Sequence, residues 1–250
     1  MKAMILAAGL GTRLRPLTND RPKALVEVAG RTMLEITLGQ LRSFGIREVI
    51  VNVHHFADLV MECLKANDNF GMDIEISREE ELLDTGGGLQ KAAHFFLKDG
   101  VEEPFILHNV DVLSTIDLEE MVKFHGEHEA LVTLAVQQRE SSRQLLFDAH
   151  GLLCGRLMDG ETHMARLSEN AQPRAFAGIH VISPRLFSRM SGGDVKGEHC
   201  FPIIPVYLRL AGEGDRIVAF PADEYYWRDL GTEASLQQAS QDMEQGALKR

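Results

Sequence analysis

The chain is organised around one stretch near its start, Met4-Ile5-Leu6-Ala7-Ala8-Gly9-Leu10-Gly11-Thr12-Arg13-Leu14-Arg15-Pro16-Leu17-Thr18, with Arg21-Pro22-Lys23 just after it. An apolar run of strand length leads into a turn that carries two glycines and then two arginines. Glycine lets backbone N–H groups approach a ligand with no Cβ in the way, and successive N–H groups in such a turn form an anion site. The stretch therefore predicts a polyphosphate-binding loop with a lysine directed at it.

Two other kinds of phosphate-binding loop do not fit these residues. The order Gly-x-x-x-x-Gly-Lys-Ser/Thr is absent, and Leu14 stands where a dinucleotide fingerprint needs its third glycine. The short pattern Gly9-x-Gly11 alone would also fit an ordinary strand-to-helix turn. The complete stretch, together with Pro22-Lys23, resembles the signature of the sugar-1-phosphate nucleotidyltransferases. Members of that family join a nucleoside triphosphate to a sugar phosphate and release pyrophosphate.

Composition and charge limit the possible partners. The 250 residues are 44% hydrophobic and 25% charged, as in an ordinary globular protein. A net charge of −11 argues against non-specific binding to nucleic acid or to an anionic membrane surface. No apolar run approaches the ~20 residues that span a bilayer, so we expect a cytoplasmic protein without a membrane partner. The cluster of basic residues around Lys23 is a local positive island in an acidic chain.

Two other features raise the question of metal or disulfide chemistry. The cysteines Cys63, Cys154 and Cys200 are odd in number and far apart, so we expect reduced thiols rather than a disulfide or metal site. The pair His54-His55 also invites a metal interpretation. Adjacent residues of a strand face opposite ways, however, so a loop or cap role is favoured.

Strand-like and helix-like patterns alternate over the first half of the chain. We expect strands at 2–8, 48–53, 72–77, 105–108 and 130–136, and helices at 33–44, 58–67 and 117–125. This order predicts an α/β fold with a doubly wound, mostly parallel, Rossmann-like sheet. Ligands of such sheets bind beyond the carboxyl ends of the strands. The Gly9 loop, the Gly86 loop and Asp111 are expected at strand-to-helix turns along that one edge.

The second half of the chain has shorter elements and no linker or repeat. Strand-like pieces at 145–147, 152–154 and 175–181 predict a small inserted or edge β layer, and helices are expected at 184–190 and 201–211. We therefore predict a single nucleotidyltransferase domain. Its parts would be a nucleotide-binding half at 1–136, a sugar-binding and second metal half at 137–232, and a C-terminal helix at 233–250.

Two aspartates are the candidates for a metal site. Mg²⁺ prefers oxygen ligands and usually takes one or two carboxylates together with substrate phosphates, and Asp111 and Asp229 are predicted at strand ends. On the residues alone, Asp111 could instead be a turn or capping residue, and Asp229 a salt-bridge partner of Arg228 or a cap. In the resemblance, Asp111 corresponds to the first metal ligand, and Trp-x-Asp-hydrophobic-Gly-Thr around Asp229 is similar to the second metal motif. Thr232 is expected to cap the last helix.

The resemblance also assigns the cationic residues. Lys23 looks like the catalytic lysine that bridges the triphosphate and the sugar phosphate, with a solvated lysine as the alternative. Arg13 has the planar fork to grip the departing pyrophosphate. Arg15 is left open between a phosphate contact and a structural salt bridge. The expected nucleotide-binding residues are Leu6, Ala8, Gly9, Gly11, Thr12, Gly86, Gly87, Gly88 and Asn109.

Two glycine-containing segments have a ligand interpretation and a structural one. Asp84-Thr85-Gly86-Gly87-Gly88 resembles the loop that holds base and ribose, although a flexible turn would look the same. Gly178 lies in a segment similar to the sugar-side strand, yet a glycine there could equally mark a β-bulge. Glu79 receives no role. Val110 occupies a position where the family commonly has glycine, which leaves the pose of the sugar open.

The sequence thus predicts a Mg²⁺-dependent enzyme that transfers a nucleoside monophosphate to a sugar 1-phosphate by direct attack on the α-phosphorus. The short length and the Thr-Gly-Gly-Gly string look most like the N-acetylmuramate-1-phosphate uridylyltransferases and other small bacterial members. UTP is the first choice of nucleotide, with dTTP, GTP and CTP behind it. The alternative is a non-catalytic nucleotide-sugar sensor on the same fold. The sugar and the oligomeric state are left open.

Overall fold

The structure is a computed structural model that describes residues 1–100, 102–190 and 199–248. The chain divides into two compact units, each made of segments that are separated in sequence. The first unit comprises Met1–Asp84, Leu107–Ile116 and Tyr225–Arg250, and the second comprises Thr85–Ile106 and Asp117–Glu224. The single domain expected from the sequence stays a prediction.

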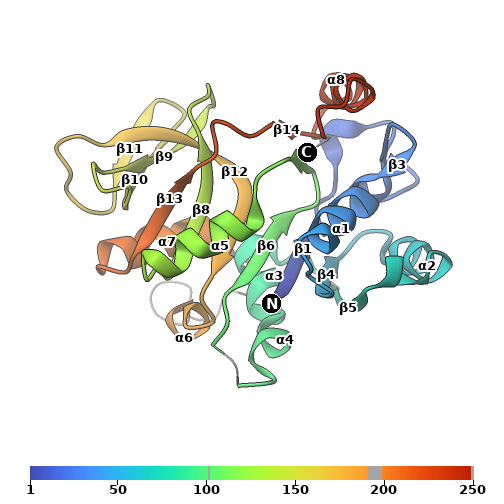
Figure 1. Ribbon diagram of the computed structural model, residues 1–250, viewed down its shortest axis with the longest axis horizontal. Coiled ribbons are helices and arrows are strands. Elements are labelled where there is room, and N and C mark those ends of the chain that lie inside the picture. Colours follow the sequence, from blue (N-terminus) through green and yellow to red (C-terminus); the bar gives the residue numbers. More distant parts are fainter. Residues whose placement is uncertain (101, 191–198, 249–250) are drawn as a thin grey trace. The chain divides into compact units, whose positions relative to one another are not determined.

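The first unit is built on parallel strands. The strands β1 (Lys2–Leu6), β4 (Glu48–Val53) and β5 (Asp73–Arg78) pair in parallel, with Leu6 opposite Asn52 and Asn52 opposite Ser77. The helices α1 (Met33–Ser43) and α2 (Ala57–Ala66) connect them in sequence (Figure 1). On the other side of β1 lies β6 (Phe105–Asn109), whose last three residues belong to this unit. This strand–helix alternation confirms the predicted α/β class with its parallel sheet.

Short elements complete the first unit. Two 3-10 turns and a small hairpin follow the glycine loop, and a two-stranded antiparallel sheet precedes the last helix. These elements are η1 (Thr12–Leu14), η2 (Lys23–Leu25), β2 (Glu27–Val28), β3 (Arg31–Thr32), β7 (Val112–Ser114) and β14 (Trp227–Asp229), and the last helix is α8 (Glu233–Glu244). A third 3-10 turn, η3 (Asp68–Gly71), lies between α2 and β5.

The turns that carry Gly9 and Asp111 differ from the prediction. Both were expected between a strand and a helix. The Gly9 loop runs instead into the 3-10 turn η1, and Asp111 lies between the strands β6 and β7. The reason at Asp111 is a distant pairing partner, because β7 pairs with β14 from the far end of the chain.

The second unit contains a mixed sheet. The strand β8 (Val132–Gln137) pairs in parallel with β13 (Ile217–Pro221) and antiparallel with β12 (Gln172–Ile182). Next to β12, the strands β9 (Arg143–Phe147), β10 (Leu153–Met158) and β11 (Glu161–Met164) form an antiparallel layer. This layer is the small β addition predicted for the segment after residue 139. The helices of this unit are α3 (Asp84–Lys91), α4 (Ala93–Leu97), α5 (Leu118–Glu127), α6 (Leu186–Met190) and α7 (Ile203–Gly212).

Three further expectations concern membrane-spanning helices, the cysteines and the pair His54-His55. Among the described residues, no helix combines the length and the apolar character needed to cross a bilayer. Cys63, Cys154 and Cys200 are free thiols, as expected. His54 contacts the Glu79 carbonyl through Nδ1, 3.0 Å away, and no group of three or more potential metal-ligating side chains occurs in the described ranges.

Candidate active site

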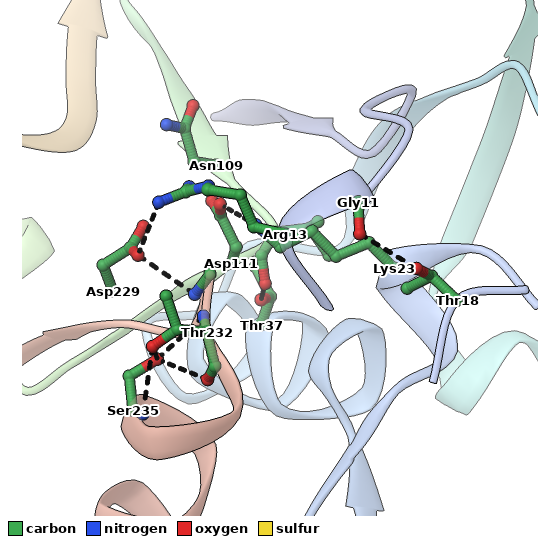
Figure 2. A network of polar contacts seen from close by, with 12 residues as sticks. Gly11, Arg13, Thr18, Lys23, Thr37, Asn109, Asp111, Asp229, Thr232 and Ser235 are labelled. Atoms are coloured by element: carbon green, nitrogen blue, oxygen red, sulfur yellow. Dashed lines mark hydrogen bonds and ion pairs between the residues drawn. The ribbon is translucent and has the colours of Figure 1, made fainter. Parts of the chain in front are cut away.

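The glycine loop is held in shape by contacts around Gly11. The backbone of Gly11 has a φ of 62°, and a Cβ there would lie 3.0 Å from Thr18 Cγ2 and 3.1 Å from Lys23 Cβ. The Thr18 hydroxyl donates to the Gly11 carbonyl at 2.9 Å (Figure 2). Both the left-handed backbone and the crowding favour glycine at this position. Gly11 therefore shapes the loop and leaves room for the start of the Lys23 side chain.

Gly9 differs from Gly11, because nothing in the described protein would touch a side chain there. A Cβ on Gly9 meets no atom within 4 Å, and the residue is exposed. Among its expected partners in nucleotide binding, Thr12 is exposed and Ala8 is buried. The Leu6 carbonyl accepts from the Val110 N–H at 3.1 Å, which ties the loop to the end of β6.

Lys23 and Asp111 form an ion pair. The Lys23 ammonium donates to Asp111 Oδ2, and the two side chains are 10% and 20% exposed. Lys23 begins the turn η2 directly after Pro22, which fixes where its side chain starts. The alternative of a solvated lysine is therefore wrong. A charge this poorly hydrated is costly unless it is paired, so the pair accounts for the burial of both groups.

Asp229 lies on the strand next to Asp111 and faces Arg13. In the β7–β14 pair Asp229 is opposite Val112, and the Leu230 N–H donates to the Asp111 carbonyl at 2.8 Å. Asp229 Oδ1 accepts from the Gly231 N–H at 3.0 Å and lies 3.9 Å from Arg13 Nη1 (Figure 2). Arg13 is 65% exposed, so its guanidinium is open to a ligand.

Gly231 makes this approach possible. A Cβ on Gly231 would lie 2.5 Å from both Arg13 Nη2 and Asp229 Oδ1. In the sequence, Gly231 is part of the motif around Asp229, and the motif alone gives it no role. Its importance depends on Arg13, which comes from the other end of the chain.

The contacts of Arg228 and Thr232 decide two of the other interpretations of this region, and those of Arg15 and Val110 stay open. Arg228 pairs with Asp242 at 2.8 Å rather than with Asp229. Thr232 caps α8, since its hydroxyl accepts from the Ser235 N–H at 3.2 Å, as predicted (Figure 2). Arg15 is exposed. Val110, which stands in place of the usual glycine, is buried in the core at 4% exposure.

The two aspartates suit a small divalent cation. Asp111 directly precedes β7 and Asp229 ends the paired strand β14, and both side chains retain partial exposure. Mg²⁺ usually takes one or two carboxylates plus waters and substrate phosphates, so a third protein ligand is not required. The oxygen donors therefore fit such a cation, and the Lys23 ammonium contacts one of the two carboxylates.

The three consecutive glycines belong to a helix rather than to the predicted turn. Gly86, Gly87 and Gly88 lie in α3, and the N–H groups of Gly86 and Gly87 donate to the Phe201 carbonyl at 2.9 and 3.2 Å. A Cβ on Gly86 would lie 2.4 Å from the Phe201 ring. The close packing against Phe201 explains why a helix carries glycine here. Because these two N–H groups already donate to Phe201, base recognition by this segment would use other backbone groups.

The remaining predicted residues fall in different units. Asn109 ends β6 in the first unit and is half-buried. Gly178 lies in β12 of the second unit with a φ of 76°, where the pairing with β8 shifts register between Phe176 and His180. The glycine thus marks a β-bulge, the structural interpretation considered above. Its contact with a sugar stays a prediction.

A buried polar pair that no sequence motif indicated holds the start of the glycine loop. Asn52 and Glu79 are each 2% exposed, and the Asn52 amide donates to Glu79 Oε1 at 2.7 Å. Asn52 Oδ1 accepts from the Ala7 N–H at 2.7 Å, and Glu79 Oε2 accepts from the Leu83 N–H at 3.0 Å. An asparagine inside the apolar run of β4 was the available signal, because buried polar side chains need partners.

His108 was also not singled out by the sequence. It lies fully buried on β6, three residues before Asp111, and Nδ1 is 2.8 Å from the Asn109 carbonyl. Burial lowers the pKa of His108 to about 4. The ring is therefore neutral near pH 7, and the Asn109 carbonyl favours the tautomer with the proton on Nδ1.

Comparison with known proteins identifies the family. The model of the nucleotidyl transferase family matches residues 2–145, which include the glycine loop, Lys23 and Asp111. The chain belongs to the nucleotidyl transferase family. It is 34% identical over 238 residues to an N-acetylmuramate alpha-1-phosphate uridylyltransferase from Caulobacter vibrioides, covering 92% of this chain and 91% of the relative. The resemblance to sugar-1-phosphate nucleotidyltransferases, and with it the expected class of enzyme, is confirmed.

Other members of the family carry a different nucleotide in their names. A mannose-1-phosphate guanyltransferase from Kluyveromyces lactis is 30% identical over 233 residues, covering 92% of this chain and 61% of its own length. An inositol-1-phosphate CTP transferase from T. maritima has a similar structure, with a TM-score of 0.75 and 16% identity over 98% of this chain and 96% of that one. The structural likeness establishes a shared fold, and the mixture of names leaves the nucleotide to be determined.

Proposed function

We propose that this nucleotidyltransferase transfers UMP from UTP to a sugar 1-phosphate. An oxygen of the sugar phosphate attacks the α-phosphorus of UTP, the bond from that phosphorus to the bridging oxygen breaks, and pyrophosphate leaves. The product is a UDP-sugar. The observation that carries the proposal is the Lys23–Asp111 ion pair, with Asp229 on the adjacent strand and Arg13 beside it.

The first unit supplies the charges that phosphoryl transfer needs. This chemistry requires positioning and electrostatic stabilisation more than covalent help from the protein. Asp111 and Asp229 would hold Mg²⁺, since a divalent metal is the general requirement of the family. When bound, Mg²⁺ would neutralise charge on the triphosphate. The backbone from Leu6 to Thr12, with Asn109, would hold the nucleotide.

Lys23 has two partners in this proposal. Its ammonium pairs with Asp111. In the reaction the same ammonium would also stabilise the negative charge that gathers as the two substrate phosphates approach each other. Arg13, largely exposed and able to donate two parallel hydrogen bonds, would hold the leaving pyrophosphate.

For the contacts to base and sugar, the candidates come from the resemblance to the family. The segment that ends in Gly86-Gly87-Gly88 is the candidate for the base, and Gly178 for the sugar. The relative from Caulobacter vibrioides supports UTP and an N-acetylmuramate 1-phosphate substrate. The guanylyltransferase relatives favour a second candidate, GTP with mannose 1-phosphate. The match covers 61% of the length of the relative from Kluyveromyces lactis, against 91% for the uridylyltransferase.

The experiment is a matrix of four nucleoside triphosphates against a panel of sugar 1-phosphates, with pyrophosphate release as the signal. We expect the highest kcat/KM with UTP and an N-acetylmuramate-type sugar 1-phosphate in the presence of Mg²⁺. Faster release with GTP and mannose 1-phosphate would replace the first candidate by the second. Pyrophosphate release that does not depend on any added sugar phosphate would contradict both.

A further inference from the structure

A polar cluster ties the strand β14 to the helix α8. Asp242 Oδ2 accepts from the Tyr226 hydroxyl at 2.6 Å, from Arg228 Nε at 3.0 Å and from Arg228 Nη2 at 2.8 Å. Asp242 Oδ1 accepts from the Gln238 amide at 2.9 Å. Arg228 Nε also lies 3.1 Å from the Tyr226 hydroxyl oxygen. The Asp242 side chain is 15% exposed, so most of its hydration has been replaced by these donors.

The cluster contacts β14 on the face opposite to Asp229, the candidate metal ligand. Side chains alternate along a strand, so Arg228 points away from the face that carries Trp227 and Asp229. On that second face Asp229 approaches Arg13. The anchored guanidinium therefore belongs to Arg228, the residue directly before Asp229 in the chain.

The strand itself is short. It is three residues long and pairs with β7, which is equally short. Backbone hydrogen bonds extend this pairing on both sides, because the Thr115 N–H donates to the Tyr226 carbonyl at 3.0 Å and the Leu230 N–H to the Asp111 carbonyl at 2.8 Å. The side-chain contacts of Arg228 and Tyr226 add to the pairing in setting the rotation of this short strand. The fixed end of α8 helps, because Thr232 caps the helix two residues after Leu230.

We propose that Asp242 is a positioning residue, which acts through Arg228 and Tyr226 to hold the Asp229 carboxylate where it binds the divalent cation. This inference rests on the proposed function, in which Asp229 is a metal ligand. Residues that orient a ligand without touching the metal commonly change metal affinity by 10- to 100-fold when they are removed. Donation from Tyr226, Gln238 and Arg228 lowers the pKa of Asp242, which keeps this carboxyl group charged at neutral pH.

The test measures metal binding directly. Mn²⁺ is titrated into the protein in the presence of UTP, and electron paramagnetic resonance measures the concentration of free Mn²⁺. The proteins compared are the wild type, Asp229→Asn, Asp242→Ala and Asp242→Glu. We expect Asp229→Asn and Asp242→Ala to raise the Mn²⁺ Kd by about 10-fold or more. Asp242→Glu keeps a carboxylate on the same face of α8 and should recover most of the affinity. Tyr226→Phe removes one hydrogen bond and should raise the Mn²⁺ Kd by a smaller factor. This variant replaces Asp242→Ala as the test if Asp242→Ala folds poorly.

A matched control separates positioning from stability. Glu213 accepts from Arg189 and Arg209 at 2.9 and 2.6 Å, so Glu213→Gln weakens a similar arginine–carboxylate cluster within the second unit. It should leave Mn²⁺ affinity unchanged. An unchanged Kd in Asp242→Ala and Tyr226→Phe, with a raised Kd in Asp229→Asn, would overturn the inference and leave the proposed function standing. An unchanged Kd in Asp229→Asn would overturn the metal role of Asp229 and the inference with it.

Discussion

At the scale of single residues, Lys23 separates a catalyst from a simple binder. Its ammonium is buried against Asp111, so it does little to attract nucleotide from solution. We predict that Lys23→Ala lowers kcat by about 10²-fold or more, as for the loss of one preorganised electrostatic group. The Kd for UTP should change much less. Steady-state kinetics beside calorimetric UTP binding measure both, and a variant that binds UTP weakly but reacts at full speed would refute the assignment.

Gly231 tests the geometry around Asp229. An alanine Cβ at 231 would lie 2.5 Å from Arg13 Nη2 and Asp229 Oδ1, so both groups must shift. We predict that Gly231→Ala raises the Mg²⁺ concentration needed for half-maximal activity and lowers kcat. The free energy of unfolding should change little, because both displaced side chains retain partial exposure.

The control for Gly231 is another glycine with room for a methyl group. Gly126 lies in α5, and a Cβ there meets no atom within 4 Å. Gly126→Ala should therefore leave the Mg²⁺ dependence as in the wild type. If Gly231→Ala behaved in the same way, the close approach of Arg13 to Asp229 would have no part in metal use.

At the scale of elements, the buried pair Asn52–Glu79 connects three strand ends. It joins the start of the glycine loop at Ala7 to the segment that enters α3 at Leu83. Glu79→Ala leaves the Asn52 amide and the Leu83 N–H without an acceptor, and each unsatisfied buried group costs about 1–3 kcal/mol. We predict a loss of that order in the free energy of unfolding, measured by urea denaturation.

A conservative variant makes the Glu79 prediction specific. Glu79→Gln keeps the shape and one acceptor oxygen, so it should lose less stability than Glu79→Ala. The KM for UTP should rise in both variants, since the loop that starts at Ala7 loses its support. Equal stability of Glu79→Ala and the wild type would show that the pair does not hold these segments.

The regular elements could be predicted from the sequence because their patterns are local. The apolar run of β4 and the helical spacing of α1 gave bounds close to those observed. The elements that were predicted wrongly depend on contacts with residues far away in the sequence. Gly86 lies in a helix because its N–H and Cα pack against Phe201, and β7 exists because β14 pairs with it.

The same distinction applies to the candidate site. The basic loop, Lys23, Asp111 and Asp229 carry local motifs, and sequence reasoning proposed them. Gly231, Asn52 and Glu79 owe their importance to neighbours from other segments, so no local pattern reveals it. Val110 illustrates the reverse case, since a departure from the family motif turned out to be a buried core residue.

At the scale of the whole molecule, two buried histidines make stability depend on pH. Burial lowers the pKa of His125 and of His108 to about 4 each. Between about pH 6.5 and 4 the unfolded chain binds protons at these residues and the folded chain does not. The free energy of unfolding should therefore be highest, as far as these histidines contribute, above about pH 6.5. It should fall as the pH drops toward 4, by up to about 1.4 kcal/mol per pH unit for each histidine.

Urea denaturation at several pH values between 7 and 4.5 measures this dependence. His125→Gln removes one titrating ring and should reduce the slope of stability against pH over that range. His150 is exposed, and His150→Gln serves as the control with an unchanged slope. A slope for His125→Gln equal to that of the wild type would show that His125 does not contribute to the acid sensitivity.

The most direct test of the proposed chemistry follows the phosphorus atoms of UTP. The protein is incubated with Mg²⁺, the sugar 1-phosphate selected from the panel, and UTP labelled with ³²P at either the α or the γ position. Direct attack on the α-phosphorus predicts that the α label appears in a UDP-sugar and that the γ label appears in pyrophosphate, with none bound to the protein. Transfer of the γ label to the sugar, or α label held covalently by the protein, would contradict it.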